Sequence, residues 1–159
     1  MQLPALTGLD LDFRDLTADH TGATTKDDTN GNGTLLLPLA TQLKVLCIAH
    51  PLTWETETLS QFTELEYLRV TYAKDLSFLT AMPRLRDLSL SNCQVEDWSA
   101  LEQLPELSYL QLIKCGGFTL EDLSKASALT DLSMTMCSIS ENRDEILSAL
   151  PKLEALSFM

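Results

Sequence analysis

Apolar residues recur in a fixed order along this chain and define seven copies of one short pattern, the last of them truncated. Each copy has leucine at its first and fourth positions and an apolar residue at its sixth, as in Leu85, Leu88 and Leu90. The other copies start at residues 6, 43, 65, 107, 129 and 153, so the first step is 37 residues and the later steps are 20 to 24. Steps of this size are typical of the stacked coils of a solenoid.

Each copy predicts one short strand followed by a return segment. Apolar residues at positions four and six, with variable residues at three, five and seven, give the alternation of a strand with one buried face. The second half of the Leu85 copy places Val95, Trp98, Leu101 and Leu104 at steps of three, which predicts a helical or 3₁₀ arc. The predicted fold class is therefore α/β, with one parallel sheet of about seven short strands opposite a helical, 3₁₀ or irregular side.

A proline closes the arc in several copies. Because proline disfavours the helical conformation of the residue before it, each arc is expected to end at the residue that precedes its proline. The pairs are Met82-Pro83, Leu104-Pro105 and Leu150-Pro151, and Leu3-Pro4 has the same relation to Leu6.

The pattern resembles that of leucine-rich repeat proteins, in particular the short 22-residue subclass found in internalins and in a phosphatase regulatory subunit. In that family the ninth position holds asparagine or cysteine, whose side chain satisfies buried backbone groups where the strand turns. Cys93, Cys115 and Cys137 occupy this position and are expected to be buried. The resemblance covers nearly all of residues 1–159 and implies a single right-handed solenoid domain. It says little about function, because such scaffolds serve unrelated partners.

The exposed strand face is the concave, ligand-binding side in this family, so function is expected there. Tyr67 and Tyr109 flank Asp87 in one row of this face, and aromatic residues and arginine are favoured at interface hot spots. An ordinary solvated sheet that carries two tyrosines is the alternative. The residues expected to bind a partner are Tyr67, Arg69, Tyr72, Asp87, Tyr109, Gln111, Ile113 and Lys114.

The net charge limits the classes of partner. The chain has 159 residues, a formal charge of −12 and a pI near 4.4. Such a field repels phosphate backbones and anionic headgroups, which argues against nucleic acid and membrane surfaces as partners. A basic protein or peptide would be attracted, although the charge is also what solubility alone requires.

Catalytic and cofactor motifs do not occur in the sequence, so the prediction is a non-enzymatic protein without a cofactor or metal. The two histidines are His20 and His50, and neither belongs to a nucleophile elbow, a phosphate loop or a zinc spacing. Cys47 lies three residues before His50 at an outward strand position, where it is expected to be accessible, and no third ligand is evident. The Gly116-Gly117 pair predicts a turn that lets Phe118 enter the core.

One segment departs from the repeat. Residues 18–33 are polar and without periodicity, and two Asn-Gly dipeptides favour turns, so a flexible loop insertion is expected. Asp28, Asn30 and Asn32 match the opening of an EF-hand calcium loop, but the twelfth position is Leu39, where a bidentate glutamate is required. An inert insertion is favoured over a calcium site.

The expected function is that of a protein-interaction module on the concave strand face. The alternative is a structural segment of a longer solenoid or a self-assembling scaffold. Both ends of the sequence fall within a repeat, which suggests either a fragment of a longer array or a homodimer that pairs residues 153–159. Since no apolar run approaches the roughly 20 residues of a transmembrane helix and the cysteines show no disulfide pattern, the cytoplasm is the expected location.

Overall fold

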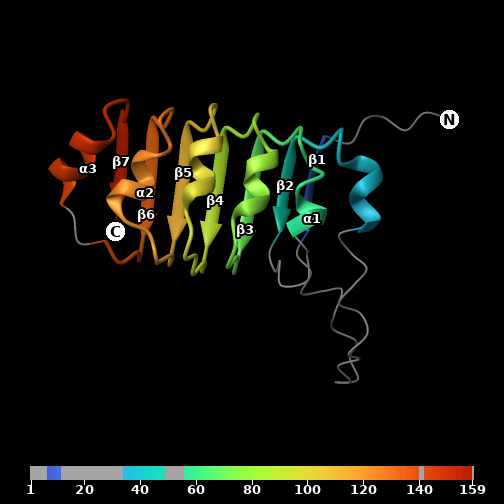
Figure 1. Cartoon of the computed structure of the whole chain (residues 1–159), viewed down its shortest axis with the longest axis horizontal. Coiled ribbons are helices and arrows are strands. Elements are labelled where there is room, and N and C mark those ends of the chain that lie inside the picture. Colours follow the sequence, from blue (N-terminus) through green and yellow to red (C-terminus); the bar gives the residue numbers. More distant parts are fainter. Residues whose placement is uncertain (1–6, 12–33, 49–55, 140–141, 159) are drawn as a thin grey trace, which may run out of the picture.

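The computed structural model describes residues 7–11, 34–48, 56–139 and 142–158, and within them a single parallel sheet of seven strands forms the inner wall of a solenoid. The strands follow one another across the sheet in sequence order (Figure 1). The strands are β1 (Gly8–Leu11), β2 (Val45–Ile48), β3 (Tyr67–Thr71), β4 (Asp87–Ser91), β5 (Tyr109–Ile113), β6 (Asp131–Thr135) and β7 (Ala155–Phe158).

The register of the sheet follows the repeat. Leu88 of β4 pairs with Leu68 of β3 on one side and with Leu110 of β5 on the other, so residues at the same repeat position lie side by side. From β2 to β6, positions four and six are buried in every strand. The predicted strand pattern is confirmed, and each coil places its leucines in one continuous spine.

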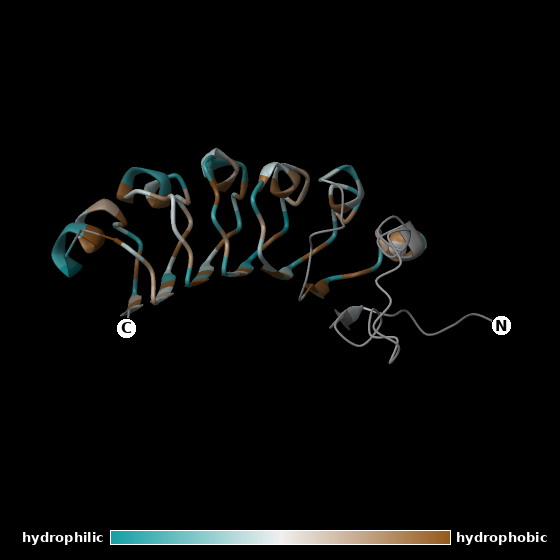
Figure 2. Cartoon of the chain, turned by 90° about the horizontal axis from the view of Figure 1, so that it is seen from below, coloured by the Kyte–Doolittle hydropathy of each residue, from teal (hydrophilic) through white to brown (hydrophobic). Residues whose placement is uncertain are grey.

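Short helical segments lie on the other side of the sheet. Figure 2 shows the strands along the inner side of an arc and the helical segments along its outer side. The segments are the 3₁₀ helices η3 (Thr34–Leu39), η4 (Ser77–Ala81) and η5 (Ser99–Gln103), and the α-helices α1 (Thr56–Leu59), α2 (Leu120–Ser124) and α3 (Arg143–Ala149). We call the two sides the concave strand face and the helical side.

Three helical segments, η4, η5 and α3, end where the prolines predict. Met82, Leu104 and Leu150 are the residues that cap η4, η5 and α3 at their C-terminal ends, and a proline follows each of them. The residue before a proline avoids the helical conformation, which is why each arc turns back toward the sheet at this point.

Trp98 and Phe118 fill the space between neighbouring coils. Trp98 is 1% exposed, its ring meets that of Phe118 edge to face with centroids 5.3 Å apart, and its Nε1–H donates to the carbonyl of Val95 at 3.1 Å. The turn that admits Phe118 requires glycine: Gly117 has φ of 79°, and a Cβ there would lie 2.2 Å from the carbonyl oxygen of Val95. The predicted Gly-Gly turn is confirmed.

The ninth-position cysteines form a ladder beneath the strand ends. The Cys115 thiol contacts the carbonyls of Leu90 in the preceding coil and Ile113 in its own coil at 3.4 and 3.5 Å, and Cys93 and Cys137 make equivalent contacts. Cys93 and Cys115 are buried as predicted. The prediction for Cys137 is wrong, since Cys137 is half-buried at the end of this ladder.

Several predictions concern residues that lie outside the described ranges. These are the loop at residues 18–33 with its calcium-like Asp28, Asn30 and Asn32, and the two histidines His20 and His50. Of the helices in the described part of the chain, none has the length and apolar character needed to cross a membrane.

Candidate binding face

All eight residues expected to bind a partner lie on β3 to β5 or directly after them. Tyr67, Asp87 and Tyr109 are consecutive partners across the three strands, so the predicted row exists. Each of the three is half-buried and holds the third position of its repeat. We call Tyr67, Asp87 and Tyr109 the Tyr-Asp-Tyr row.

Asp87 is the unusual member of this row. Its Oδ1 atom is shielded from solvent and has no hydrogen-bond partner among the described residues. Burial raises the pKa of the Asp87 carboxyl above its ordinary value, and the charge of Arg69 opposes this increase. A buried acceptor without a donor costs stability, so the position of this oxygen is not explained by a hydrogen bond within the described residues.

The next row along the strands differs from its prediction. Arg69 and Gln111 flank Ser89 as expected, but Ser89 is only 2% exposed although it occupies an outward position. Its hydroxyl donates to Oε1 of Gln111 at 2.9 Å, and the longer side chains on both sides of it cover the short one. Ser89 therefore fixes Gln111 from below and is not itself available to a partner.

Arg69 lies close enough to act on both neighbouring members of the Tyr-Asp-Tyr row. Burial raises the pKa of Tyr67, and the positive charge of Arg69 and a hydrogen bond between the two side chains only partly oppose this increase. Arg69 is exposed and forms no ion pair within the described ranges. Its guanidinium therefore already contacts Tyr67 at the surface of the face.

The remaining predicted residues lie near the strand ends. Ile113 is the last residue of β5 and is half-buried, and Lys114 follows it with an exposed side chain. Tyr72 follows β3 and is 44% exposed. These three residues extend the face toward one rim.

The backbone conformation at this rim was not predicted from the sequence. The residues at the eighth repeat position are left-handed, with φ between 52° and 60°, and they are Tyr72, Asn92, Lys114 and Met136. The conformation lets an N–H at this position reach the next strand, as in the bond of 2.9 Å from Tyr72 to the carbonyl of Ser91. It costs roughly 1 kcal/mol or more per residue, and only Asn92 is of a type that favours it. The recurrence of the position between strand and cysteine is the only signal that could have located it.

Ion pairs between coils occupy the opposite rim, where the strands begin. Lys44 pairs with Glu66 at 2.6 Å, and this bond lowers the pKa of Glu66. The corresponding pairs in the next coils are Arg84 with Glu64 at 2.7 Å and Arg86 with Glu106 at 2.9 Å. These cations are already paired, so the strand-entry rim offers less to a partner than the centre of the face.

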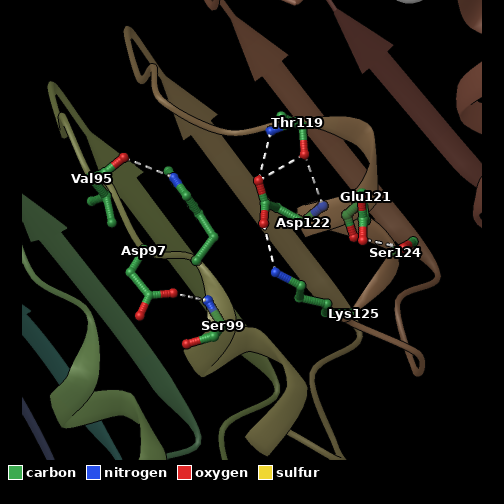
Figure 3. A network of polar contacts seen from close by, with 9 residues as sticks. Val95, Asp97, Ser99, Thr119, Glu121, Asp122, Ser124 and Lys125 are labelled. Carbon is green, nitrogen blue, oxygen red and sulfur yellow. Dashed lines mark hydrogen bonds and ion pairs between the residues drawn. The ribbon is translucent and has the colours of Figure 1, made fainter.

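Carboxylates on the helical side have structural partners. Figure 3 shows Asp97, whose carboxylate accepts the backbone N–H of Ser99 at 2.8 Å, and Asp122, which accepts from Thr119 and from Lys125. The hydrogen bond from Ser99 lowers the pKa of Asp97. Burial raises the pKa of Asp122, but the bonds from Lys125 and Thr119 outweigh it and leave the pKa below its ordinary value.

A shallow groove of about 590 Å³ lies between α2 and α3 on the helical side. Its polar lining is committed to the start of α3, where the Asn142 side chain accepts the backbone N–H groups of Asp144 and Glu145. The described residues contain no group of three or more histidine, cysteine, aspartate or glutamate side chains that could hold a metal ion. Within the described residues, the Tyr-Asp-Tyr row thus contains the buried side-chain oxygen that lacks a hydrogen-bond partner, Oδ1 of Asp87.

Comparisons with known proteins show which solved structures have a similar fold. No family model and no curated protein sequence matches the chain. Among solved structures, an internalin from Listeria monocytogenes is similar, with a TM-score of 0.61 and 21% identity over 78% of this chain and 38% of the internalin. A leucine-rich repeat protein from Leptospira interrogans gives a TM-score of 0.60 and 24% identity, over 78% of this chain and 32% of that protein.

The chain has the leucine-rich repeat fold. A third similar structure is the Arabidopsis receptor kinase HAESA in complex with the peptide hormone IDA and the co-receptor SERK1, with a TM-score of 0.59 and 19% identity over 81% of this chain and 23% of the receptor. The chain thus spans between about a quarter and two fifths of the length of these three leucine-rich repeat proteins. The predicted fold is confirmed, and at these identities the similarity concerns the fold alone.

Proposed function

We propose that this chain is a protein-interaction module that binds a protein or peptide partner on the concave strand face at β3 to β5. The observation that carries the proposal is the Tyr-Asp-Tyr row, in which two half-buried aromatic rings flank a carboxylate whose Oδ1 accepts no hydrogen bond from the described residues. Large aromatic residues carry much of the energy of protein interfaces. A leucine-rich repeat structure recorded with a peptide hormone supports the choice of a peptide or protein as ligand.

The distribution of charge refines what kind of partner fits. The concave strand face carries both signs, with Arg69 and Lys114 near Asp87 and Asp131. The helical side is mainly acidic, as in the pairs Glu96-Asp97 and Glu121-Asp122. The net charge of −12 attracts basic partners at long range, while the contact surface itself is mixed. A partner with a basic overall charge and a mixed contact segment suits both features.

Assembly through β7 is less well supported as a function. The N–H of Ala155 bonds to Thr130 of the preceding coil, so the carbonyl of the next residue, Leu156, faces away from β6. Nη1 of Arg143 donates to that carbonyl at 3.2 Å. Another strand that paired at this edge would have to displace Arg143, which is the kind of protection that natural sheet edges use against unwanted pairing.

A peptide-display selection tests the proposal. Random peptides are selected on the immobilised protein, and the affinity of each clone is then measured for the wild type, Tyr109→Ala and Glu102→Ala. Tyr109→Ala should weaken binding about tenfold or more, because it removes a half-buried ring from the centre of the face. Glu102 lies exposed on η5, so Glu102→Ala is the matched control on the helical side and should leave affinity unchanged.

The outcome that contradicts the proposal is a set of clones whose affinity is insensitive to Tyr109→Ala. Clones that respond to Glu102→Ala would move the binding surface to the helical side. Circular dichroism and thermal unfolding of each variant keep loss of binding separate from loss of folding.

A further inference from the structure

The geometry of the Tyr-Asp-Tyr row suits one particular kind of ligand group. Adjacent parallel strands lie about 4.8 Å apart, so the backbones of Tyr67 and Tyr109 are separated by about 9.6 Å with Asp87 midway between them. The strands lie on the inner side of the arc (Figure 2). A group seated above Asp87 would therefore lie between the two tyrosines of the neighbouring strands.

This distance suits a cation. A guanidinium or ammonium group interacts favourably with an aromatic face when it lies within about 6 Å of the ring centre. A cation above Asp87 would lie between the two tyrosines and would also be attracted by a carboxylate that is partly removed from water. Arginine suits such a position best, because its planar guanidinium both stacks on aromatic rings and bonds to carboxylates.

Asp87 differs from Asp97 and Asp122 in its hydrogen bonds. Asp97 and Asp122 accept hydrogen bonds from the ends of helical segments, whereas Oδ1 of Asp87 accepts none within the described structure. Protein interiors seldom leave such an acceptor unpaired, and an exception points to a missing donor. A cation above this carboxylate would interact favourably with its charge, which no ion pair within the described residues neutralises.

Arg69 shows that a guanidinium is compatible with this surface. It belongs to the neighbouring row, and its charge acts on Tyr67 and Asp87 without satisfying Oδ1. Arg69 would repel a second cation at close range. It should therefore limit the affinity of a lone cationic group, even though it adds contacts to a complete partner.

We propose that the Tyr-Asp-Tyr row is a seat for an arginine side chain of the partner, held between the rings of Tyr67 and Tyr109 above the carboxylate of Asp87. This inference rests on the proposed function and specifies which part of the partner the concave strand face recognises. Its chemistry is that of a single cation, so it can be tested without knowledge of the partner.

The test is a titration followed by two-dimensional NMR of the backbone amides at constant ionic strength. The probe is N-acetyl-arginine methylamide, and the control probe is the citrulline analogue, which has nearly the same shape without the charge. The arginine probe should give saturable shifts centred on the Tyr-Asp-Tyr row, and the citrulline probe should bind at least about fivefold more weakly. Equal binding of the two probes would overturn the proposal.

Variants separate this seat from general attraction to an acidic protein. Asp87→Asn should weaken the arginine probe about fivefold or more, whereas Asp97→Asn on the helical side should not change its affinity. Arg69→Gln should strengthen the probe, because a competing positive charge is removed. Shifts spread over the acidic helical side, or an equal effect of the two aspartate variants, would show long-range attraction only and contradict the seat. The spectra themselves report whether each variant is folded.

Failure of this inference is distinguishable from failure of the proposed function. If selected peptides depend on Tyr109 but the arginine and citrulline probes bind equally, the binding face stands and the seat is wrong. If no peptide depends on Tyr109, the proposed function is wrong whatever the probes do.

Discussion

On the helical side, Asp75 and Asp97 occupy the same place in successive coils, and each accepts a backbone N–H at the start of a 3₁₀ helix at 2.8 Å. On the concave strand face, Asp87 has an oxygen that accepts nothing within the described residues. The hydrogen bonds lower the pKa of Asp75 and Asp97, and burial raises that of Asp87. An aspartate side chain therefore stabilises the fold on the helical side, whereas Asp87 destabilises it on the concave strand face.

This contrast separates structure from function in a repeat protein. Residues that recur at one repeat position and satisfy backbone groups are explained by the fold. A residue that costs stability and has no structural partner needs another explanation, and unsatisfied or perturbed groups of this kind gather at binding and active sites. The following predictions test whether the two sides differ in this way.

The largest expected effect on the free energy of unfolding comes from removing the side chain of Trp98, which fills the interior beneath the helical side. Trp98→Ala should lower the free energy of unfolding by about 3 to 5 kcal/mol, because it leaves a cavity beside Phe118 and an unpaired carbonyl at Val95. Urea denaturation followed by circular dichroism measures the change. Trp98→Phe keeps a ring and should lose less, and a loss below about 1 kcal/mol for the alanine variant would contradict the packing described.

Gly117→Ala tests the turn between β5 and α2. The left-handed φ of Gly117 and the contact of 2.2 Å that a Cβ would make with Val95 both require the backbone to shift, so we expect a loss of about 1 to 3 kcal/mol. Gly116→Ala is the matched control. Its Cβ would meet only the flexible end of Gln94 at 3.0 Å, and equal losses in the two variants would show that φ is not the cause.

The repeating part of this molecule could be predicted from the sequence, because periodicity reports packing directly. The spacing of Leu85, Leu88 and Leu90 fixed the strand and its register, and the prolines fixed where the arcs end. The same repeats located the Tyr-Asp-Tyr row, since residues at equal positions of successive coils must be neighbours in the sheet.

The features that the sequence could not predict depend on neighbours of different size and on backbone conformation. Ser89 holds an outward position, yet Arg69 and Gln111 cover it, and alternation alone contains no information about the length of adjacent side chains. The left-handed conformation of Tyr72 and Lys114 goes against their intrinsic preference, and the N–H of each bonds to the next strand. For the same reason, only the structure could show that Oδ1 of Asp87 accepts no hydrogen bond from the described residues.

Thiol labelling tests how deeply each of the four cysteines is buried. Cys47 and Cys137 are half-buried and should react with a thiol reagent at least about tenfold faster than Cys93 and Cys115, which are buried and require local opening. The hydrogen bond with Cys115, together with burial, raises the pKa of Cys93, and the same bond lowers that of Cys115. Cys115 should therefore react before Cys93 once the interior opens.

Mass spectrometry of peptides after brief labelling of the native protein gives the order of reaction. Labelling in urea, where all sites are exposed, serves as the control. Fast labelling of Cys93 in the native state would contradict the register of the ladder.

The smallest expected effect concerns Asp87 and Asp97, which should respond to pH with opposite signs. The folded pKa of Asp87 is raised, so folding favours its neutral form, and stability is lost as the pH rises through the folded pKa. Asp87→Asn should therefore stabilise the protein at pH 7, by at most about 1 kcal/mol because the group is only partly buried, and should have little effect below about pH 4.

The folded pKa of Asp97 is lowered, so its contribution is present at neutral pH and is lost as the pH falls through the folded pKa. Asp97→Asn should accordingly destabilise the protein at pH 7 and not at low pH. Urea denaturation of both variants across this range decides the matter: a loss of stability in Asp87→Asn at pH 7 would show that the carboxylate supports the fold, and the case for its role in binding would then lose its main argument.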